Sequence, residues 1–272
     1  MDRGEKSDSH AIDITTASVA RMYDWLLGGI ENYEADRQAC GELLKIAPST
    51  KALALNNRSF LRRVVRILAQ DYGIRQFIDH GSGLPTQDNV HEIVQRIDPQ
   101  ARVVYIDNDP IVLAHGRTVL EENALTTVVD EDMRDTDQIF NRPEVRRLID
   151  CDQPIAALFV SVLHCIDDDE AATLIRQVAN KLPHGSFIVI CQLVSDHSHV
   201  REDATRLMQE ATGGKWGRVR ERQDVERYFE GLVIEDPGLT DVTHWRPDNE
   251  VVPRQHVDDW IEWGGLGRVT KT

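Results

Sequence analysis

The sequence is poor in cysteine and has no long apolar run. It contains four cysteines with no Cys-x-x-Cys pair among them, which argues against both a disulfide framework and a zinc site. No stretch approaches the roughly 18 apolar residues that suggest a membrane-spanning helix. The polar first residues do not resemble a signal peptide. We therefore expect a cytoplasmic protein without a metal or a membrane partner, and a disordered N-terminus over residues 1–13.

Basic residues are also scarce. The chain has 31 Lys and Arg residues against 46 Asp and Glu residues, so its formal net charge is −15 at pH 7. Such a charge repels phosphate backbones, and nucleic acid is not expected as a partner. Arg58, Arg62 and Arg66 do align at a spacing of four. They lie opposite apolar positions, a pattern typical of the solvated face of a helix.

Strand signals are missing from the first quarter of the chain. Apolar residues recur at spacings of three and four over residues 19–27, which predicts a helix that ends at a pair of glycines. Further helices are expected over 38–46 and 56–70. We therefore predict an N-terminal helical cap over residues 14–73, placed before the first strand.

From residue 75 the chain alternates between strand-like and helix-like segments. Strands are expected at 75–80, 102–107, 125–130, 154–163 and 186–194, and helices at 86–97, 110–123, 136–149 and 168–181. This alternation predicts right-handed crossovers and a doubly wound, parallel α/β sheet over residues 74–272.

The last part of the chain has weaker patterns. Helices are expected over 200–211 and 223–229. Two short strand-like segments, 232–234 and 241–245, follow, and a turn-forming Asp-Pro-Gly-Leu lies between them. We expect these segments to form an antiparallel hairpin at one edge of the sheet.

Two apolar runs each end in an acid. Residues 77–83 read Phe-Ile-Asp-His-Gly-Ser-Gly, and residues 103–107 read Val-Val-Tyr-Ile-Asp. Glycine adopts positive φ without penalty and lets a ligand lie against the backbone. An acid at the tip of the neighbouring strand is placed to accept ribose hydroxyls. Together the two runs predict a nucleoside site.

The third glycine of a dinucleotide fingerprint is absent. Thr86 stands in its place, and Pro85 removes a backbone donor. A diphosphate cradle, and with it a nicotinamide-dependent reductase, is therefore poorly supported. S-adenosylmethionine is a nucleoside without phosphate and needs only the close approach that Gly81 and Gly83 allow. We predict it as the cofactor.

Six motifs spread over residues 14–265 carry a resemblance to a known family. They read Ser-Val-Ala-Arg-Met-Tyr-Asp-Trp-Leu-Leu-Gly-Gly at 18–29, Asn-Arg-Ser-Phe-Leu-Arg-Arg at 57–63, Asp-His-Gly-Ser-Gly-Leu-Pro-Thr at 79–86, Asn-Val-His-Glu at 89–92, Tyr-Ile-Asp-Asn-Asp-Pro at 105–110 and Trp-Arg-Pro at 245–247. The chain resembles the S-adenosylmethionine-dependent methyltransferase superfamily. More narrowly, it is similar to an actinobacterial S-adenosyl methyltransferase family formerly catalogued as a domain of unknown function. The resemblance implies a Rossmann-like, doubly wound seven-stranded sheet with an antiparallel last strand.

The resemblance also implies where the cofactor binds. The glycine loop would contact its methionine part, the acid after the second strand would accept both ribose hydroxyls, and the methyl group would lie beside the end of the fourth strand. The implied residues are Asp79, Gly81, Ser82 and Gly83 for methionine, Asp107 for ribose, Asn108, Asp132 and Met133 for adenine, and Ser161, Val162 and His164 for the methyl end.

Three residues stand out for their own chemistry. His164 follows a strand end, where open α/β sheets bind ligands, and its pKa range suits it to take a proton from an acceptor. The alternative is a hydrogen-bonded wall residue. Tyr23 and Arg58 are polar residues in the predicted cap, which would exclude water from the cofactor. We expect both to line the pocket, with Arg58 pairing with the cofactor carboxylate, although Tyr23 also suits core packing.

The function expected from these features is methyl transfer from S-adenosylmethionine to a small-molecule acceptor. The negative charge favours a neutral or cationic metabolite. Methyl transfer needs alignment and exclusion of water, and a general base is optional. The alternative is a cofactor-binding sensor or partner protein without catalysis. The acceptor and the oligomeric state are not defined by the sequence.

Overall fold

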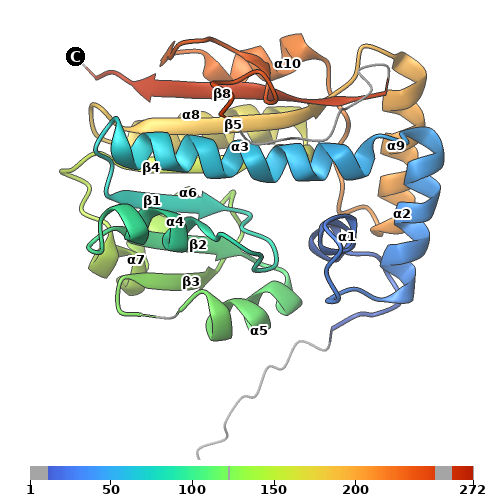
Figure 1. The fold of residues 1–272 in the computed structure, drawn as a ribbon, viewed down its shortest axis with the longest axis horizontal. Helices are drawn as coiled ribbons and strands as arrows, with labels where there is room; N and C mark the ends of the chain where they lie inside the picture. The colour runs from blue at the N-terminus through green and yellow to red at the C-terminus, as the bar shows by residue number, and fades with distance from the viewer. Residues whose placement is uncertain (1–11, 122, 249–258, 272) are drawn as a thin grey trace, which may run out of the picture.

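A computed structural model describes residues 12–121, 123–248 and 259–271 (Figure 1). Most of the segment expected to be disordered, residues 1–11, lies outside the described residues. None of the described helices is long and apolar enough to cross a membrane.

A single mixed sheet forms the centre of the molecule, in the order β3-β2-β1-β4-β5-β8-β6, with β7 paired to β8 (Figure 1). The first five strands are parallel, and β8 runs antiparallel to β5. The strands are β1 (Gln76–His80), β2 (Arg102–Asp107), β3 (Thr126–Asp130), β4 (Ala156–Val160), β5 (Phe187–Val194), β6 (Leu232–Ile234), β7 (Thr240–Asp241) and β8 (Ile261–Val269). The predicted doubly wound sheet with an antiparallel last strand is confirmed.

The helices follow the predicted alternation, but α4 and α5 are shorter than expected, whereas α2, α3 and α9 begin earlier. They are α1 (Val19–Leu26), α2 (Glu34–Ile46), α3 (Thr50–Gln70), α4 (Val90–Ile97), α5 (Pro110–Val119), α6 (Thr136–Asn141), α7 (Pro143–Leu148), α8 (Asp168–Lys181), α9 (Ser198–Ala211) and α10 (Arg222–Glu226), with 3-10 turns at Leu163–Cys165 and Arg227–Phe229. The single helix expected over 136–149 is two helices, because Pro143 begins α7 and cannot continue α6.

The predicted closing hairpin is wrong. Strands β6 and β7 do not pair with each other, and each pairs with β8 instead. Strand β8 was missed because three of its residues are glycine, which is depleted in strands. Gly264 lies opposite Cys191 of β5, and a Cβ on it would stand 1.9 Å from the carbonyl oxygen of Ile190. This close approach of the two strands requires glycine.

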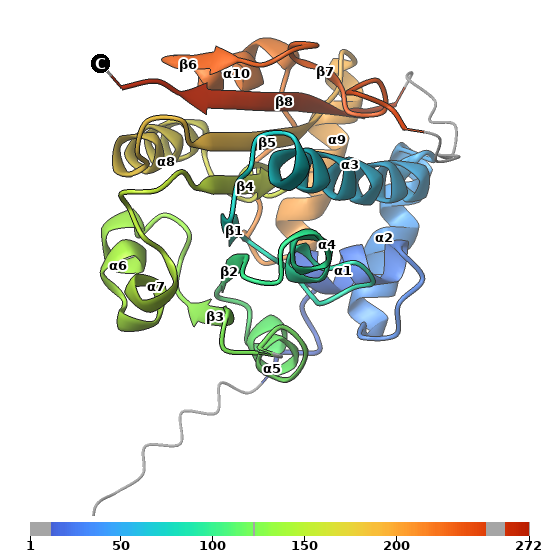
Figure 2. The same cartoon turned by 60° about the vertical axis from the view of Figure 1, so that its left-hand side comes forward.

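Helices cover both faces of the sheet (Figure 2). Helices α6, α7 and α8 pack in the apolar core on one face, and α3, α4 and α5 pack on the other. On the second face Phe60 of α3 meets Trp245 edge-on, with ring centroids 5.5 Å apart. Most of α3 therefore belongs to the sheet layer, although it precedes the first strand.

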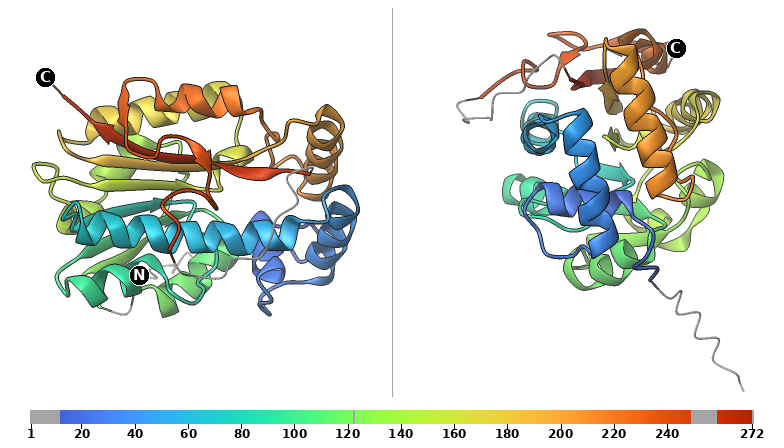
Figure 3. Two further views of the ribbon diagram at one scale, coloured as in Figure 1. Left: turned by 45° about the horizontal axis from the view of Figure 1, so that its top comes forward. Right: turned by 90° about the vertical axis from the view of Figure 1, so that its right-hand side faces the viewer.

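A separate cap lies at the end of the molecule where the parallel strands finish. Its apolar core joins α1, α2 and the start of α3 to α9, and α2 and α9 run side by side (Figure 3). A buried ion pair, Arg21 Nε to Asp36 Oδ2 at 2.8 Å, ties α1 to α2. The cap therefore contains α9, a helix late in the chain, in addition to helices of the predicted N-terminal cap.

Candidate functional site

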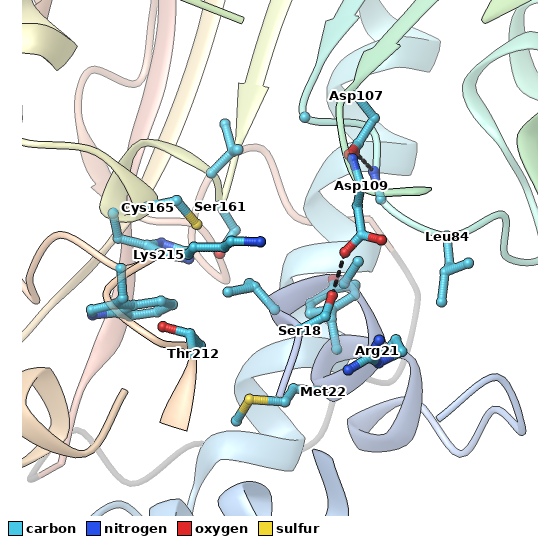
Figure 4. Close-up of a pocket in the computed structure, with 18 of the residues that line it drawn as sticks. Ser18, Arg21, Met22, Leu84, Asp107, Asp109, Ser161, Cys165, Thr212 and Lys215 are labelled. Carbon is cyan, nitrogen blue, oxygen red and sulfur yellow. Dashed lines mark hydrogen bonds between the residues drawn. The ribbon is translucent and has the colours of Figure 1, made fainter. Parts of the chain in front are cut away.

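A cavity of about 960 Å³ lies between the cap and the carboxyl ends of the parallel strands. Its walls come from the turns that follow β1, β2, β3 and β4, from the first three helices, and from the segment around the end of α9 (Figure 4). This is the edge of an open α/β sheet where ligands bind.

The backbone N–H groups of the glycine turn after β1 donate to groups on the neighbouring strand β2. Gly81 and Gly83 both have φ of +67°, and a Cβ on Gly81 would meet Val162 at 2.3 Å. The amides of Gly81 and Ser82 donate to the carbonyl of Ile106, and the amide of Gly83 donates to Asp107 Oδ2 at 2.9 Å. These donors are not available to a diphosphate, which agrees with the missing third glycine.

Asp107 ends β2 at the cavity wall. Its Oδ2 accepts from the Gly83 amide and its Oδ1 accepts from the Asp109 amide, each at 2.9 Å. Burial raises the pKa of Asp107 to about 6 despite these bonds. The two amides fix the orientation of the carboxylate, and each oxygen retains a lone pair for a ligand hydroxyl.

Asp79 and Arg58 bring opposite charges to the glycine-turn end of the cavity. Burial raises the pKa of Asp79 to about 7, which the positive charge of Arg58 opposes and the charge of Asp107 reinforces. The Arg58 guanidinium donates to the carbonyls of Gln87 and Asp88 at 3.1 and 3.0 Å. Arg58 therefore reaches across from α3 to the loop before α4.

The loop after β3 presents Asp132 and Met133 to the cavity. Arg134 holds the Asp132 carboxylate through its Nε at 2.9 Å and a terminal nitrogen at 2.6 Å, and it lowers the pKa of Asp132. Met133 is buried against the apolar core beneath. Asn108 lies on the same side of the cavity, directly after Asp107.

Ser161 follows β4 in an unusual conformation. It has φ of +56°, which is uncommon for a residue other than glycine. Its amide donates to the carbonyl of Cys191, and its hydroxyl donates to Glu262 Oε1 of β8. Glu262 is 1% exposed. Burial raises the pKa of this carboxyl to about 7.

His164 lies in the turn after Ser161 and lines the cavity. Its ring packs on Trp216, with centroids 4.3 Å apart, and its Nδ1 has no hydrogen-bond partner. Burial, with the charge of Arg220, lowers the pKa of His164 to about 3. An imidazole of such low basicity stays neutral near pH 7 and is a poor proton acceptor.

Tyr23 connects the cap to the sheet. Its hydroxyl donates to Asn57 Oδ1 at 2.7 Å, and Asn57 in turn donates to the Cys191 thiol at 3.2 Å. Burial raises the pKa of Tyr23 well above its usual value. The tyrosine thus lines the cavity and also anchors α1 on α3.

The structure brings every predicted site residue to this one cavity. Those residues are Tyr23, Arg58, Asp79, Gly81, Ser82, Gly83, Asp107, Asn108, Asp132, Met133, Ser161, Val162 and His164. In the described part of the chain, no group of three or more His, Cys, Asp or Glu side chains is placed to hold a metal ion.

Several cavity residues were not predicted. Ser18 immediately precedes α1, and its hydroxyl donates to Asp109 Oδ2 at 2.5 Å (Figure 4). Lys215, after α9, extends into the cavity in the same view. An apolar portion of the wall is formed by Met22, Leu53, Leu193, Met208, Trp216 and Trp260. Ser18 and Met22 lie within the motif at 18–29, but no local pattern indicates that these residues share a cavity, because the fold brings them together from distant segments.

S-adenosylmethionine fits the residues present. The Ser82 hydroxyl oxygen is buried without a partner at the glycine turn, and Gly83 has open space where its Cβ would be. Asp107 offers lone pairs to a ribose, while Asp79 and Arg58 offer one charge of each sign to an amino-acid zwitterion. No phosphate is needed to satisfy these groups.

Comparison with known proteins agrees with this geometry. Residues 5–270 match the model of the S-adenosyl methyltransferase family. The crystal structure of a "putative methyltransferase" from Thermobifida fusca is 37% identical, covers 98% of this chain and 100% of its own, and superimposes with a TM-score of 0.89.

A second solved structure, a DUF574 family protein from Streptomyces avermitilis, is 32% identical over 94% of this chain and 98% of its own, with a TM-score of 0.86. Among curated proteins no match was found. The chain therefore belongs to the S-adenosyl methyltransferase family and is a methyltransferase that uses S-adenosylmethionine.

Proposed function

We propose that the chain methylates a small-molecule acceptor held in the same cavity as the cofactor. The observation that carries this proposal is the size of the cavity, about 960 Å³, and its position beneath the cap. Pockets for a single ligand span about 300–1,000 Å³. The cavity is at the upper end of this range and is larger than a nucleoside cofactor alone requires, and we infer that the remaining space receives a second small molecule. A sensor that only bound the cofactor would not need this additional space.

Asp107 is assigned to the ribose. Its two oxygens are held by the amides of Gly83 and Asp109, so the carboxylate is oriented before any ligand arrives. Preorganised acceptors lose little entropy on binding a pair of hydroxyls. Asn108, Asp132 and Met133, on the same side, would contact adenine.

Asp79 and Arg58 are assigned to the amino-acid end of the cofactor. The carboxylate of Asp79 would attract the ammonium group, and the guanidinium of Arg58 would attract the carboxylate. Arg58 already counteracts the raised pKa of Asp79 through its charge, so the two side chains are close enough to interact. Gly81, Ser82 and Gly83 would lie along the methionine backbone between them.

S-adenosylmethionine supplies a methyl group that its positively charged sulfur activates toward displacement. The protein has to align the acceptor and exclude water. Tyr23, in the cap, lines the cavity and holds α1 onto α3 through Asn57, which supports the role of a lid. His164, neutral near pH 7, would form part of the wall beside the methyl group.

A small molecule suits this site better than a nucleic acid. The chain carries a formal net charge of −15, which repels phosphate backbones. Asp79, Asp107 and Asp109 place part of this negative charge on the cavity wall. The acceptor would therefore be neutral or cationic in its overall charge.

Titration calorimetry with S-adenosylhomocysteine tests the cofactor site. We expect Asp107→Ala to weaken binding by about 10-fold or more, because hydrogen bonds to a charged group are lost. Asp152→Ala is the matched control, since Asp152 is exposed and lies outside the cavity. Equal affinities for the Asp107 variant and the wild type would contradict the ribose assignment.

A further inference from the structure

Ser161 and Glu262 form a polar pair at the acceptor side of the cavity. They are 101 residues apart in the chain, and the Ser161 hydroxyl donates to Glu262 Oε1. Ser161 lines the cavity, whereas Glu262 is 1% exposed and contacts the cavity through the serine. Ser161 holds a left-handed backbone conformation, with φ of +56°. Such a conformation is strained in a residue other than glycine and is concentrated at functional sites.

Glu262 has properties that a purely structural contact between β8 and the end of β4 would not need. Its second oxygen, Oε2, is buried without a hydrogen-bond partner. Burial and the nearby charge of Asp241 both raise its pKa, while the hydroxyl of Ser161 and the thiol of Cys191 lower it. A buried acid with one oxygen left without a partner destabilises the fold, and an apolar side chain at this position would be less destabilising.

The titratable groups around Glu262 come from three elements. Cys191 of β5 hydrogen-bonds to it, and burial keeps the pKa of that thiol well above its ordinary value. Asp241 of β7 acts on it through charge. Tyr23 of α1 is influenced by the charge of Glu262, and its own pKa is raised. Of these groups, the carboxyl of Glu262 is the one that the Ser161 hydroxyl touches.

The wall beyond this pair is apolar. Leu193 lies directly opposite Glu262 in the β5–β8 register and faces into the apolar cluster of the cap. Trp216, Trp260 and Met208 continue this wall. In Figure 4 Ser161 and Cys165 lie on one side of the cavity, opposite Asp107 and Asp109. An acceptor here would place an apolar body against the cap and present a polar atom to Ser161.

We propose that Ser161 and Glu262 form a proton relay for the hydroxyl of an acceptor whose body is apolar. The proposal rests on the proposed function, because it uses the space left beside the bound cofactor. Ser161 would touch the acceptor directly. Glu262 would act through Ser161 and is a positioning and proton-accepting residue.

The relay transfers a proton from the acceptor hydroxyl to Glu262 by way of Ser161. The acceptor O–H bond breaks, and its proton passes to Ser161 Oγ while the serine hydroxyl proton passes to Glu262 Oε1. The electron pair left on the acceptor oxygen forms the new bond to the methyl carbon. The electron pair of the broken carbon–sulfur bond stays on sulfur, which becomes a neutral thioether. The proton rests on Glu262 and is released to solvent afterwards.

The test uses 2-naphthol, a flat apolar molecule with one hydroxyl, as the probe acceptor. The variants are Glu262→Gln, which keeps a hydrogen-bonding group, and Ser161→Gly, which removes the hydroxyl and tolerates the positive φ. Affinity for S-adenosylhomocysteine is measured first. It should be similar in the wild type and both variants, because Glu262 is not among the residues implied for the cofactor and S-adenosylhomocysteine lacks the methyl group beside which Ser161 is expected to lie.

Infrared titration then follows the carboxyl of Glu262 without turnover. Because Asp79 also has its pKa raised to about 7, the band of Glu262 is taken from the difference between the wild-type and Glu262→Gln spectra, and we expect this band to disappear as pH rises through about 7. Methylation of 2-naphthol by the wild type should rise with pH over the same range, because the relay needs ionised Glu262. Both variants should be slower by about 100-fold or more and lose that pH dependence.

Three results would overturn the inference. One is a Glu262→Gln variant with the rate and pH profile of the wild type, and another is the same for Ser161→Gly. The third is a wild-type protein that binds S-adenosylhomocysteine but neither binds nor methylates 2-naphthol. If the wild type failed to bind S-adenosylhomocysteine, the proposed function would fail first and the relay with it.

Discussion

The hydroxyl of Ser18 donates to Asp109 Oδ2 at 2.5 Å, which joins the first turn of the cap to the loop after β2. Ser18 and Asp109 are 91 residues apart in the chain. The other oxygen of Asp109 caps α5 by accepting from the Ile111 amide at 3.0 Å. One carboxylate thus contacts both α5, the helix that follows Asp107, and the cap (Figure 4).

We expect Ser18→Ala to loosen the lid without altering the rest of the site. Loss of this hydrogen bond should make S-adenosylhomocysteine dissociate about 2- to 10-fold faster. Stopped-flow fluorescence measures the dissociation rate. Ser18→Thr keeps the hydroxyl and should behave like the wild type, and unchanged dissociation in Ser18→Ala would show that this bond does not hold the lid.

Arg58→Ala should weaken S-adenosylhomocysteine binding by about 10-fold, because an ion pair with the ligand carboxylate is lost. The same change should leave the affinity for 5′-methylthioadenosine, which lacks the amino-acid part, almost unaltered. Calorimetry with both ligands separates a local role from general damage.

Arg147→Ala is the control for Arg58→Ala, since Arg147 is exposed and outside the cavity. An equal loss of affinity for both ligands would contradict the placement of the carboxylate at Arg58.

Asp79→Asn should stabilise the free protein while it weakens cofactor binding. The pKa of Asp79 is raised to about 7 in the folded state, whereas an unfolded aspartate titrates near 3.9. The native state therefore binds more protons between these values, and the contribution of Asp79 to stability falls as pH rises from about 4 to about 7.

At pH 8 the buried charge is absent from the Asp79→Asn variant. Its free energy of unfolding should exceed that of the wild type by on the order of 2 kcal/mol. At pH 4 the two should differ little. Urea denaturation at both pH values measures this, and a variant less stable than the wild type at pH 8 would show that the charge of Asp79 is well compensated.

Gly264→Ala should destabilise the fold strongly. The new Cβ would stand 1.9 Å from the Ile190 carbonyl oxygen, so β5 and β8 must separate. The expected loss is about 3 kcal/mol or more. Gly41→Ala is the matched control, because Gly41 lies inside α2 with nothing within 4 Å of its added Cβ.

In Gly41→Ala the better helix propensity of alanine should increase stability by up to about 1 kcal/mol. Thermal unfolding compares the two alanine variants. Equal stability of Gly264→Ala and the wild type would show that the last strand tolerates a side chain there.

Local motifs were enough to predict the parallel half of the fold and a set of residues that line one cavity. The glycine turn at Gly81 and the acid at Asp107 are each read from a few neighbouring residues, and strand order then brings them together. Contacts between distant segments could not be read in this way. The hydrogen bond between Ser161 and Glu262 depends on β8, a strand that was not predicted because of its glycines. The hydrogen bond from Ser18 to Asp109 depends on how the cap packs against the sheet.

The pKa values of the site residues also could not be predicted from the sequence. His164 was expected to suit proton transfer because histidine titrates near neutral pH. Burial beside Trp216 lowers its pKa to about 3, whereas burial raises that of Glu262 to about 7. Burial depends on the complete fold. It makes His164 a poor proton acceptor near pH 7, and it makes Glu262, which no motif marks, a better one.

The most direct test of the cofactor and acceptor assignments is a crystal structure of the complex with S-adenosylhomocysteine. We predict that the ribose hydroxyls bind Asp107, that the amino-acid end lies between Asp79 and Arg58, and that the sulfur faces Ser161 across open space. A ligand bound in the reverse direction, with adenine against Ser161, or a sulfur walled off from the apolar portion of the cavity, would contradict the account.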